Sequence, residues 1–168
     1  ECEKISNLII TTGGVSVGDA DYIRDALNKI GRINFWKISI KPGRPLAYGK
    51  IGKSFFFGLP GNPVSAAVTF ELFVMPAINK ILGLKQKTKI IIKAKTVSEI
   101  RKKKGRVEYK RACLIQNKKG SFVKISGLQG SNILTSLSKA NCYIRLASNV
   151  NVIKKDSVVD VIPFSEEI

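Results

Sequence analysis

The residues with the clearest chemical potential lie in the first 24 positions. An apolar run, Leu8-Ile9-Ile10, leads into Thr11-Thr12-Gly13-Gly14 and then Val15-Ser16-Val17-Gly18. Two acids, Asp19 and Asp21, open a segment with helical spacing, so the stretch is typical of a strand, a loop and a helix. Loops in this position of an open α/β sheet are where ligands bind.

The glycines of this loop suit a phosphate, and its acids suit a cation. Gly13, Gly14 and Gly18 lack a Cβ and accept positive φ, so the backbone can approach an anion closely. Asp19 and Asp21 would repel a bare phosphate unless a divalent cation such as Mg²⁺ bridged carboxylate and phosphate oxygens. The structural alternative is that Asp19 caps the helix and the glycines form an ordinary turn.

Two later segments also suit an anion. The turn Lys41-Pro42-Gly43-Arg44-Pro45 holds two cations three residues apart, an arrangement that grips an oxyanion but also occurs in plain surface turns. The segment Leu59-Pro60-Gly61-Asn62-Pro63-Val64-Ser65 leads into a helix, with Asn62 as its N-cap. The free N–H groups of the first turn and the hydroxyl of Ser65 form a second potential anion site.

Elements that position these loops are predicted for an α/β domain over residues 1–86. We expect a helix over residues 22–30 ending at Gly31, and a strand over 33–40. We also expect a hairpin of residues 46–48 and 54–58 with three buried phenylalanines. A long helix from Pro63 to Leu82 is predicted to bend at Pro76 and stop at Gly83.

From about Thr88 onward the sequence pattern is typical of short strands and no longer of helices. The sequence therefore predicts a second, all-β domain over residues 87–168 with a barrel-like form. The expected strands cover residues 90–92, 107–116, 121–126, 140–146 and 157–162.

Composition narrows the class of protein. The 168 residues are 44% hydrophobic, enough for a core, and the longest apolar run is interrupted by polar residues, so we expect no membrane span and see no signal peptide. Three widely spaced cysteines disfavour a disulfide framework, and a reducing cytoplasm is the natural setting. The chain starts at Glu1 just before a strand, so we expect it to be a piece of something longer.

The net charge of +17 suggests an anionic partner, and the densest basic run is Arg101-Lys102-Lys103-Lys104 with Arg106. No RNA-recognition signature or zinc finger accompanies it, and no aromatic residues alternate with it. A solvated loop is therefore the preferred interpretation, with nucleic-acid binding as the alternative.

Taken together, the loop motifs resemble the molybdopterin molybdenumtransferase family, the MoeA and gephyrin E-domain enzymes. The resemblance rests on Thr11–Tyr22, Lys41–Leu46 and Gly58–Ala66 in this order and spacing, and continues through Gly105–Arg111 and Gly127–Ser131. It implies an open-sheet molybdopterin-binding domain, of which the first part is missing, followed by a β-barrel domain. It also implies a reaction: molybdate enters adenylylated molybdopterin with Mg²⁺-dependent release of AMP, in a homodimer.

The resemblance assigns roles residue by residue. Asp21 matches the acid that serves Mg²⁺ and the cleavage of the adenylyl pyrophosphate, and Asp19 lies in the same loop. Gly13, Gly14, Val15 and Ser16 would cradle the pterin phosphate. The remaining matched positions lie near the pterin or the molybdate: Lys37, Lys41, Arg44, Pro60, Pro63, Ser65, Arg111 and Ser131.

Other functions stay open at this point. A molybdopterin adenylyltransferase shares the α/β core, although its loop continues Gly-Thr-Gly and it lacks the β-domain. A non-catalytic binding or scaffold module is the second alternative, because relatives in animals also bind receptor segments. Further acids of the family lie upstream of residue 1, so we expect the 168 residues alone to be inactive or nearly so.

Overall fold

The computed structural model describes residues 1–14, 27, 29–85 and 89–164. It divides into two compact units: Glu1–Ile38 with Pro42–Gln86, and Ser39–Lys41 with Lys87–Ile168. The division after residue 86 coincides with the predicted boundary between the α/β domain and the all-β domain. The inclusion of residues 39–41 in the second unit was not expected.

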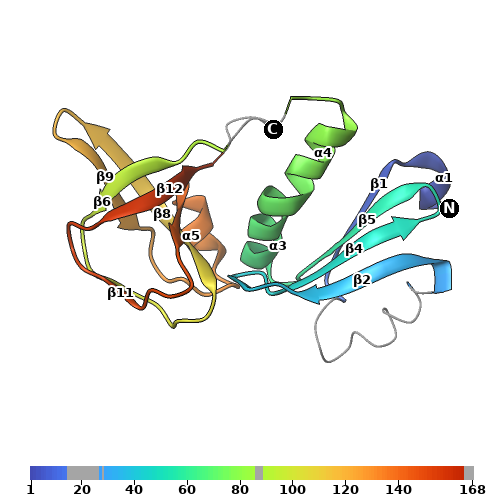
Figure 1. The fold of residues 1–168 in the computed structure, drawn as a ribbon, viewed down its shortest axis with the longest axis horizontal. Helices are drawn as coiled ribbons and strands as arrows, with labels where there is room; N and C mark the ends of the chain where they lie inside the picture. The colour runs from blue at the N-terminus through green and yellow to red at the C-terminus, as the bar shows by residue number, and fades with distance from the viewer. Residues whose placement is uncertain (15–26, 28, 86–88, 165–168) are drawn as a thin grey trace. The chain divides into compact units, whose positions relative to one another are not determined.

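A four-stranded sheet forms the centre of the first unit (Figure 1). Its strands stand in the order β1 (Leu8–Thr12), β5 (Ser54–Leu59), β4 (Pro45–Ile51) and β2 (Gly31–Lys37). β1 runs parallel to β5, and β4 runs antiparallel to both β5 and β2. Three strands therefore end at the same edge, which confirms the predicted open α/β sheet.

Local sequence explains most of these elements. The predicted hairpin is β4 and β5, joined at Gly52, whose φ of +55° suits glycine. Phe56 and Phe57 are buried, whereas Phe55 is only half-buried. The helix α1 (Cys2–Ile5) precedes β1. The predicted helix over residues 22–30 lies mostly outside the described residues, and Gly31 begins β2 rather than capping that helix.

The long predicted helix is present as one 19-residue segment, Pro63–Ile81. It consists of α3 (Pro63–Thr69), a π-helical stretch η1 (Phe70–Val74) and α4 (Met75–Ile81). The Met75 N–H donates to the Phe70 carbonyl five residues earlier, directly before Pro76, which has no N–H to continue an α-helical pattern. The departure from α-helical hydrogen bonding therefore lies in the turn before Pro76 and not at Pro76 itself. Gly83, with φ +70°, follows the helix end as predicted.

By length and composition alone the same helix is long and apolar enough to cross a membrane, which we did not expect from its interrupted sequence. In the first unit its apolar side chains pack against the sheet. Val74 belongs to a buried cluster with Leu46, Phe57 and Leu59, and Phe70 and Phe73 lie against that cluster.

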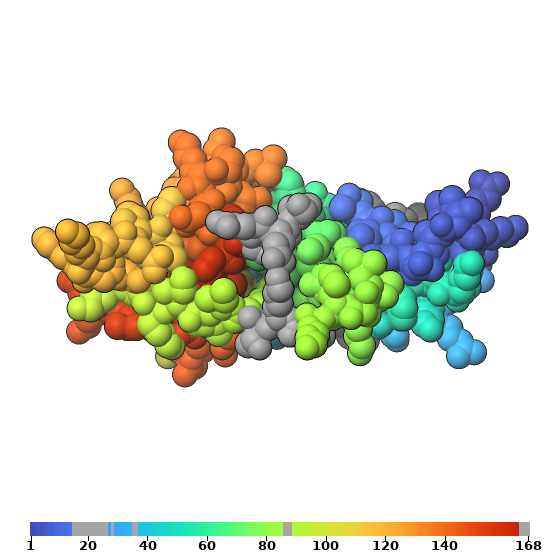
Figure 2. All heavy atoms as spheres, turned by 90° about the horizontal axis from the view of Figure 1, so that it is seen from above, coloured from blue at the N-terminus to red at the C-terminus, as the bar shows by residue number. Residues whose placement is uncertain are grey.

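The second unit is a closed β-sheet, as predicted. Its strands stand in the order β10 (Cys142–Leu146), β12 (Val158–Pro163), β6 (Ile92–Thr96), β9 (Gly120–Ile125) and β8 (Val107–Asn117), and β10 also pairs with β8. This second pairing closes the barrel around a core that includes Ala112, Ile144 and Val161. The tip of the β8–β9 hairpin projects from the unit (Figure 2).

Smaller elements complete this unit. β3 (Ile40–Lys41) adds to β8 in parallel, and β7 (Ile100–Arg101) pairs with β11 (Val152–Ile153). A five-residue helix, α5 (Leu134–Ser138), follows the loop after β9. The sequence did not predict α5, because five residues are too few for a periodic apolar pattern.

Candidate functional site

The first unit gathers its candidate residues at one edge of the sheet. β1, β5 and β2 run in the same direction, so Thr12, Leu59 and Lys37, their last residues, mark a common edge. β4 starts at that edge, since Pro45 pairs with Lys37. From β1 to β2 the edge spans three strand spacings, roughly 14 Å. The carboxyl edge of a sheet of this kind is a ligand-binding position.

Two glycine-containing loops touch at this edge. The Gly13 N–H donates to the Leu59 carbonyl at 2.9 Å, which ties the end of β1 to the end of β5. A Cβ on Gly61 would lie 3.4 Å from the Cα of Gly13, so the backbones of the two loops approach each other closely. Gly13 and Gly14 have φ of +87° and +69°, the left-handed values that the sequence predicted for a cradle.

The helix start lies directly after the second of these loops. Asn62 is the N-cap residue, as predicted, and its carbonyl accepts from the Ala66 N–H at 2.9 Å, but its side chain makes no capping hydrogen bond. Ser65 is 4% exposed, Pro60 is buried and Pro63 is exposed. The helix begins with Pro63 and has no acid in its first turn, so its start is favourable for an anion.

Two basic residues share the edge. Lys37 ends β2 and Arg44 immediately precedes β4, and both are exposed. The loop between them is closed by a hydrogen bond of 2.8 Å from the Ile38 N–H to the Arg44 carbonyl. Lys37 and Arg44 therefore supply positive charge at the edge that carries the glycine loops.

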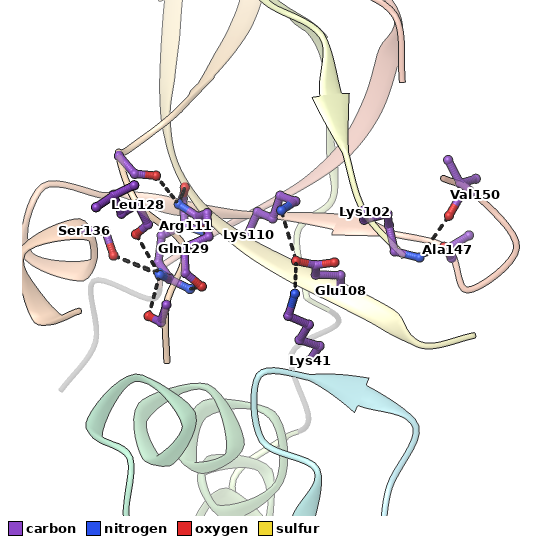
Figure 3. A network of polar contacts seen from close by, with 12 residues as sticks. Lys41, Lys102, Glu108, Lys110, Arg111, Leu128, Gln129, Ser136, Ala147 and Val150 are labelled. Carbon is purple, nitrogen blue, oxygen red and sulfur yellow. Dashed lines mark hydrogen bonds and ion pairs between the residues drawn. The ribbon is translucent and has the colours of Figure 1, made fainter. Parts of the chain in front are cut away.

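Lys41 differs from this group because it belongs to β3 in the second unit. Its ammonium lies 3.3 Å from Oε1 of Glu108, and Lys110 places its own ammonium 3.0 Å from the same oxygen (Figure 3). The predicted joint grip of Lys41 and Arg44 on one oxyanion stays a prediction, since the two residues belong to different units.

Arg111 is buried in the second unit, with 1% of its surface exposed. Its guanidinium donates to the carbonyls of three consecutive residues, Leu128 (3.1 Å), Gln129 (3.3 Å) and Gly130 (2.9 Å). It also donates to the hydroxyl of Ser136 in α5, at 2.9 and 3.1 Å (Figure 3). Burial lowers the pKa of the guanidinium, and the charges of Tyr143 and Glu108 partly offset this.

These contacts give Arg111 a role in holding the loop after β9. Its predicted contact with substrate stays a prediction, because most of its donors already face protein oxygens. Ser131 directly follows the held carbonyls and is half-buried. No hydrogen bond of its hydroxyl is present among the described residues.

The predicted magnesium site lies outside what the structure describes. Val15, Ser16, Asp19 and Asp21 fall in the range 15–26. Among the described residues no group of three or more acids, cysteines or histidines could hold a metal ion. Residues 11–14 and 59–65 at the edge contribute backbone amides and hydroxyls, so a cation there would need the two acids of the loop.

Sequence reasoning missed Glu108 and Gln129, which the structure ties to Lys41 and Arg111. The signal for Glu108 was available in the alternation of charged residues on β8, where Glu108 and Lys110 share a face. For Gln129 the sequence offered no comparable pattern, because its partners are backbone atoms.

Comparisons with known proteins agree with this arrangement. A family model described as "Probable molybdopterin binding domain" matches residues 2–80, and one described as "MoeA C-terminal region (domain IV)" matches residues 93–164. A molybdopterin biosynthesis MoeA protein from Pyrococcus horikoshii has a similar structure, with a TM-score of 0.77 and 25% identity over 96% of this chain and 38% of that one.

Curated relatives cover the same residues. A molybdopterin molybdenumtransferase of Haemophilus influenzae is 42% identical over 95% of this chain, and gephyrin of Dictyostelium discoideum is 35% identical over 96%. The chain spans 40% and 26% of the lengths of these two relatives. Because the two family models match in consecutive order and together reach from residue 2 to residue 164, the chain belongs to the MoeA family of molybdopterin-binding proteins.

Proposed function

We propose that this chain acts in molybdenum cofactor biosynthesis, as part of a longer molybdopterin molybdenumtransferase. The reaction inserts molybdate into adenylylated molybdopterin and releases AMP. The observation that carries the proposal is the common edge of the first unit. Two touching glycine loops, a helix start and two cations meet there, in a chain whose relatives include a named molybdopterin molybdenumtransferase.

The edge provides for an extended anionic ligand. Gly13 leaves room for a phosphate close to the backbone, and the helix start at Pro63 favours negative charge. Lys37 and Arg44 stand roughly two to three strand spacings from β1, so they can contact a different part of the same ligand. Arginine at position 44 adds a bidentate grip that lysine lacks.

A magnesium ion would supply charge neutralisation on the phosphates and orientation of the attacking oxygen. Asp21, with Asp19 beside it, would hold that ion. Ser65, which is buried, would offer its hydroxyl to the oxyanion. Pro60 and Pro63 would line the same pocket. In the second unit, Lys41, Arg111 and Ser131 are proposed to act on the molybdate.

The alternative of a molybdopterin adenylyltransferase is less well supported. That family lacks the β-domain, whereas residues 93–164 match the MoeA C-terminal region. We place the reaction in the cytoplasm, which the three widely spaced cysteines favour, and the full-length protein in a homodimer, as the resemblance implies.

Binding of adenylylated molybdopterin, measured by calorimetry with and without Mg²⁺, tests the proposal. The wild-type chain is expected to bind, and Mg²⁺ is expected to strengthen binding. Asp21→Ala should abolish the gain from Mg²⁺ but keep the metal-free affinity. Arg44→Ala should weaken binding by roughly tenfold or more, because a charge-assisted hydrogen bond is lost.

Lys53→Ala is the matched control. Lys53 is an exposed cation in the turn between β4 and β5, at the opposite edge of the same sheet. Its removal changes the net charge as Arg44→Ala does, so it should alter affinity by less than about twofold if the effect is local. Equal losses in both variants, or no binding by a folded wild-type chain, would count against the proposal.

A further inference from the structure

The side chain of Gln129 bonds to the main chain of β8 where the ladder with β9 ends. The β8–β9 ladder ends with the pair Ala112 and Ile125. At the next residue of β8 the Ser126 N–H still donates to the Arg111 carbonyl at 3.1 Å, but the Arg111 N–H has no backbone acceptor on that side among the described residues. Gln129 fills this position: its Oε1 accepts from the Arg111 N–H at 2.9 Å, and its Nε2 donates to the Arg111 carbonyl at 3.2 Å. The same Nε2 donates to the Gly127 carbonyl at 3.0 Å.

These partners also fix the orientation of the amide. Its oxygen faces an N–H group and its nitrogen faces two carbonyl oxygens, so a flipped amide would mismatch every contact. The backbone of Gln129 is held as well, because its carbonyl accepts from the Arg111 guanidinium. Residue 129 is therefore clamped to Arg111 through both its side chain and its main chain (Figure 3).

The clamp lies two residues before Ser131. Gly130, between them, gives its carbonyl to Arg111 at 2.9 Å and to the Ile133 N–H at 3.2 Å. The hydroxyl of Ser131 has no hydrogen bond among the described residues, so its position depends on the backbone that carries its Cβ. Replacing Gln129 with alanine would remove three of the hydrogen bonds that hold that backbone and leave those of the Arg111 guanidinium.

We propose that Gln129 is a positioning residue, whose side-chain amide holds the loop Gly127–Ser131 so that the Ser131 hydroxyl can meet the oxyanion substrate. The inference rests on the proposed function for the role of Ser131. The holding of the loop by Gln129 itself is a separate property, and it can be measured without substrate.

The first experiment follows amide hydrogen exchange in the free 168-residue chain by NMR. Gln129→Ala should accelerate exchange of the Arg111 amide by roughly tenfold or more, since its only side-chain acceptor is lost. Gln116→Ala is the matched control, because Gln116 is an exposed glutamine of β8 whose side chain, among the described residues, bonds to the Ser121 hydroxyl alone. Unchanged exchange at Arg111 in Gln129→Ala would overturn the proposal.

The second experiment titrates the same variants with molybdate. Gln129→Ala is expected to weaken binding about tenfold, and Gln116→Ala to leave it within twofold. In a Ser131→Ala background the change at Gln129 should have less than a twofold effect, because the residue acts through Ser131. An undiminished loss in that background, or normal binding by Gln129→Ala, would overturn the proposal.

Gln129→Glu separates positioning from a merely structural contribution. The introduced carboxylate keeps one acceptor for the Arg111 N–H but turns a second oxygen toward two carbonyls. Protonation restores a donor, so affinity relative to wild type should recover between pH 7.5 and pH 5, as a carboxyl in this setting titrates above roughly 4.3. A constant ratio over that range would contradict the proposal. If wild type binds no molybdate, the proposed function fails, and the exchange measurement still decides on Gln129.

Discussion

Lys41 and Glu108 are joined by an ion pair of 3.3 Å, although they lie 67 positions apart in the chain. The pairing follows from β3, which places Lys41 opposite Glu108 on β8. Lys110 shares the same carboxylate oxygen at 3.0 Å. The side chains of Glu108 and Lys110 are only 4% and 10% exposed, whereas that of Lys41 is 46% exposed. Lys110 therefore depends on Glu108 for its counter-charge more than Lys41 does.

Glu108→Gln should lower the free energy of unfolding by roughly 3 kcal/mol, because it leaves the nearly buried ammonium of Lys110 without a negative partner. Lys41→Met should cost less than about 1 kcal/mol, as expected for a half-exposed pair. Urea denaturation followed by circular dichroism measures both. The double variant Glu108→Gln, Lys110→Met should regain much of the loss. A double variant no more stable than Glu108→Gln would show that the lysine charge is not the cause.

Lys102 makes a different kind of buried contact. It is 9% exposed, and its ammonium donates to the carbonyls of Ala147 and Val150, each at 3.0 Å. Lys102→Met should destabilise the second unit by roughly 2 kcal/mol, because these carbonyls lose a charged donor. Lys103→Met, at the exposed neighbouring position, should stay within about 0.5 kcal/mol. Equal unfolding midpoints for the two variants would argue against the carbonyl contacts as the source.

The sequence predicted the elements whose signals are local. The hairpin at Gly52, the helix from Pro63 and four of the five predicted barrel strands follow from periodicity and from turn residues over short ranges. The strand predicted over residues 90–92 was misplaced, because β6 is Ile92–Thr96. The glycine loop was also foreseen, since Gly13 and Gly14 adopt positive φ. A barrel-like domain was predicted, but the pairing of β10 with β8 that closes it was not. No local sequence signal indicates the register of that pairing.

The sequence could not predict contacts between residues that lie far apart in the chain. Lys41 was grouped with Arg44 because the two stand three positions apart, yet residues 39–41 pair with β8. Arg111 was assigned to substrate by its motif alone, and its burial against three carbonyls depends on a loop 17 to 19 positions away. In each case the partner depends on tertiary packing, which spacing along the chain does not predict.

Two glycines of the first unit should resist substitution for different reasons, Gly49 because of a steric clash and Gly13 because of backbone strain. A Cβ at Gly49 would lie 2.0 Å from the carbonyl oxygen of Arg32, so Gly49→Ala must push β2 away from β4 and should cost roughly 3 kcal/mol. At Gly13 a Cβ would meet nothing within 4 Å, but φ is +87°, so Gly13→Ala should cost roughly 1–2 kcal/mol through strain alone. Urea unfolding followed by far-ultraviolet circular dichroism measures both losses. A larger loss for Gly13→Ala than for Gly49→Ala would contradict this account.

Cys142 should make the second unit sensitive to alkaline pH. Its side chain is fully buried, and burial raises the pKa of the thiol from 9.0 to about 12. Between these two pH values the unfolded chain loses the thiol proton while the folded chain keeps it, so the folded state binds more protons and its stability falls as pH rises. Below pH 9 both states carry the proton, and this contribution is constant.

The measurement compares the free energies of unfolding of wild type and Cys142→Ala across pH. The advantage of wild type over the variant should be flat below pH 9 and shrink from there toward pH 12. Tyr109, whose pKa is also raised by burial, titrates in both proteins and therefore cancels from the difference. An advantage that stays constant to pH 12 would mean that the thiol of Cys142 ionises alike in the folded and unfolded chains.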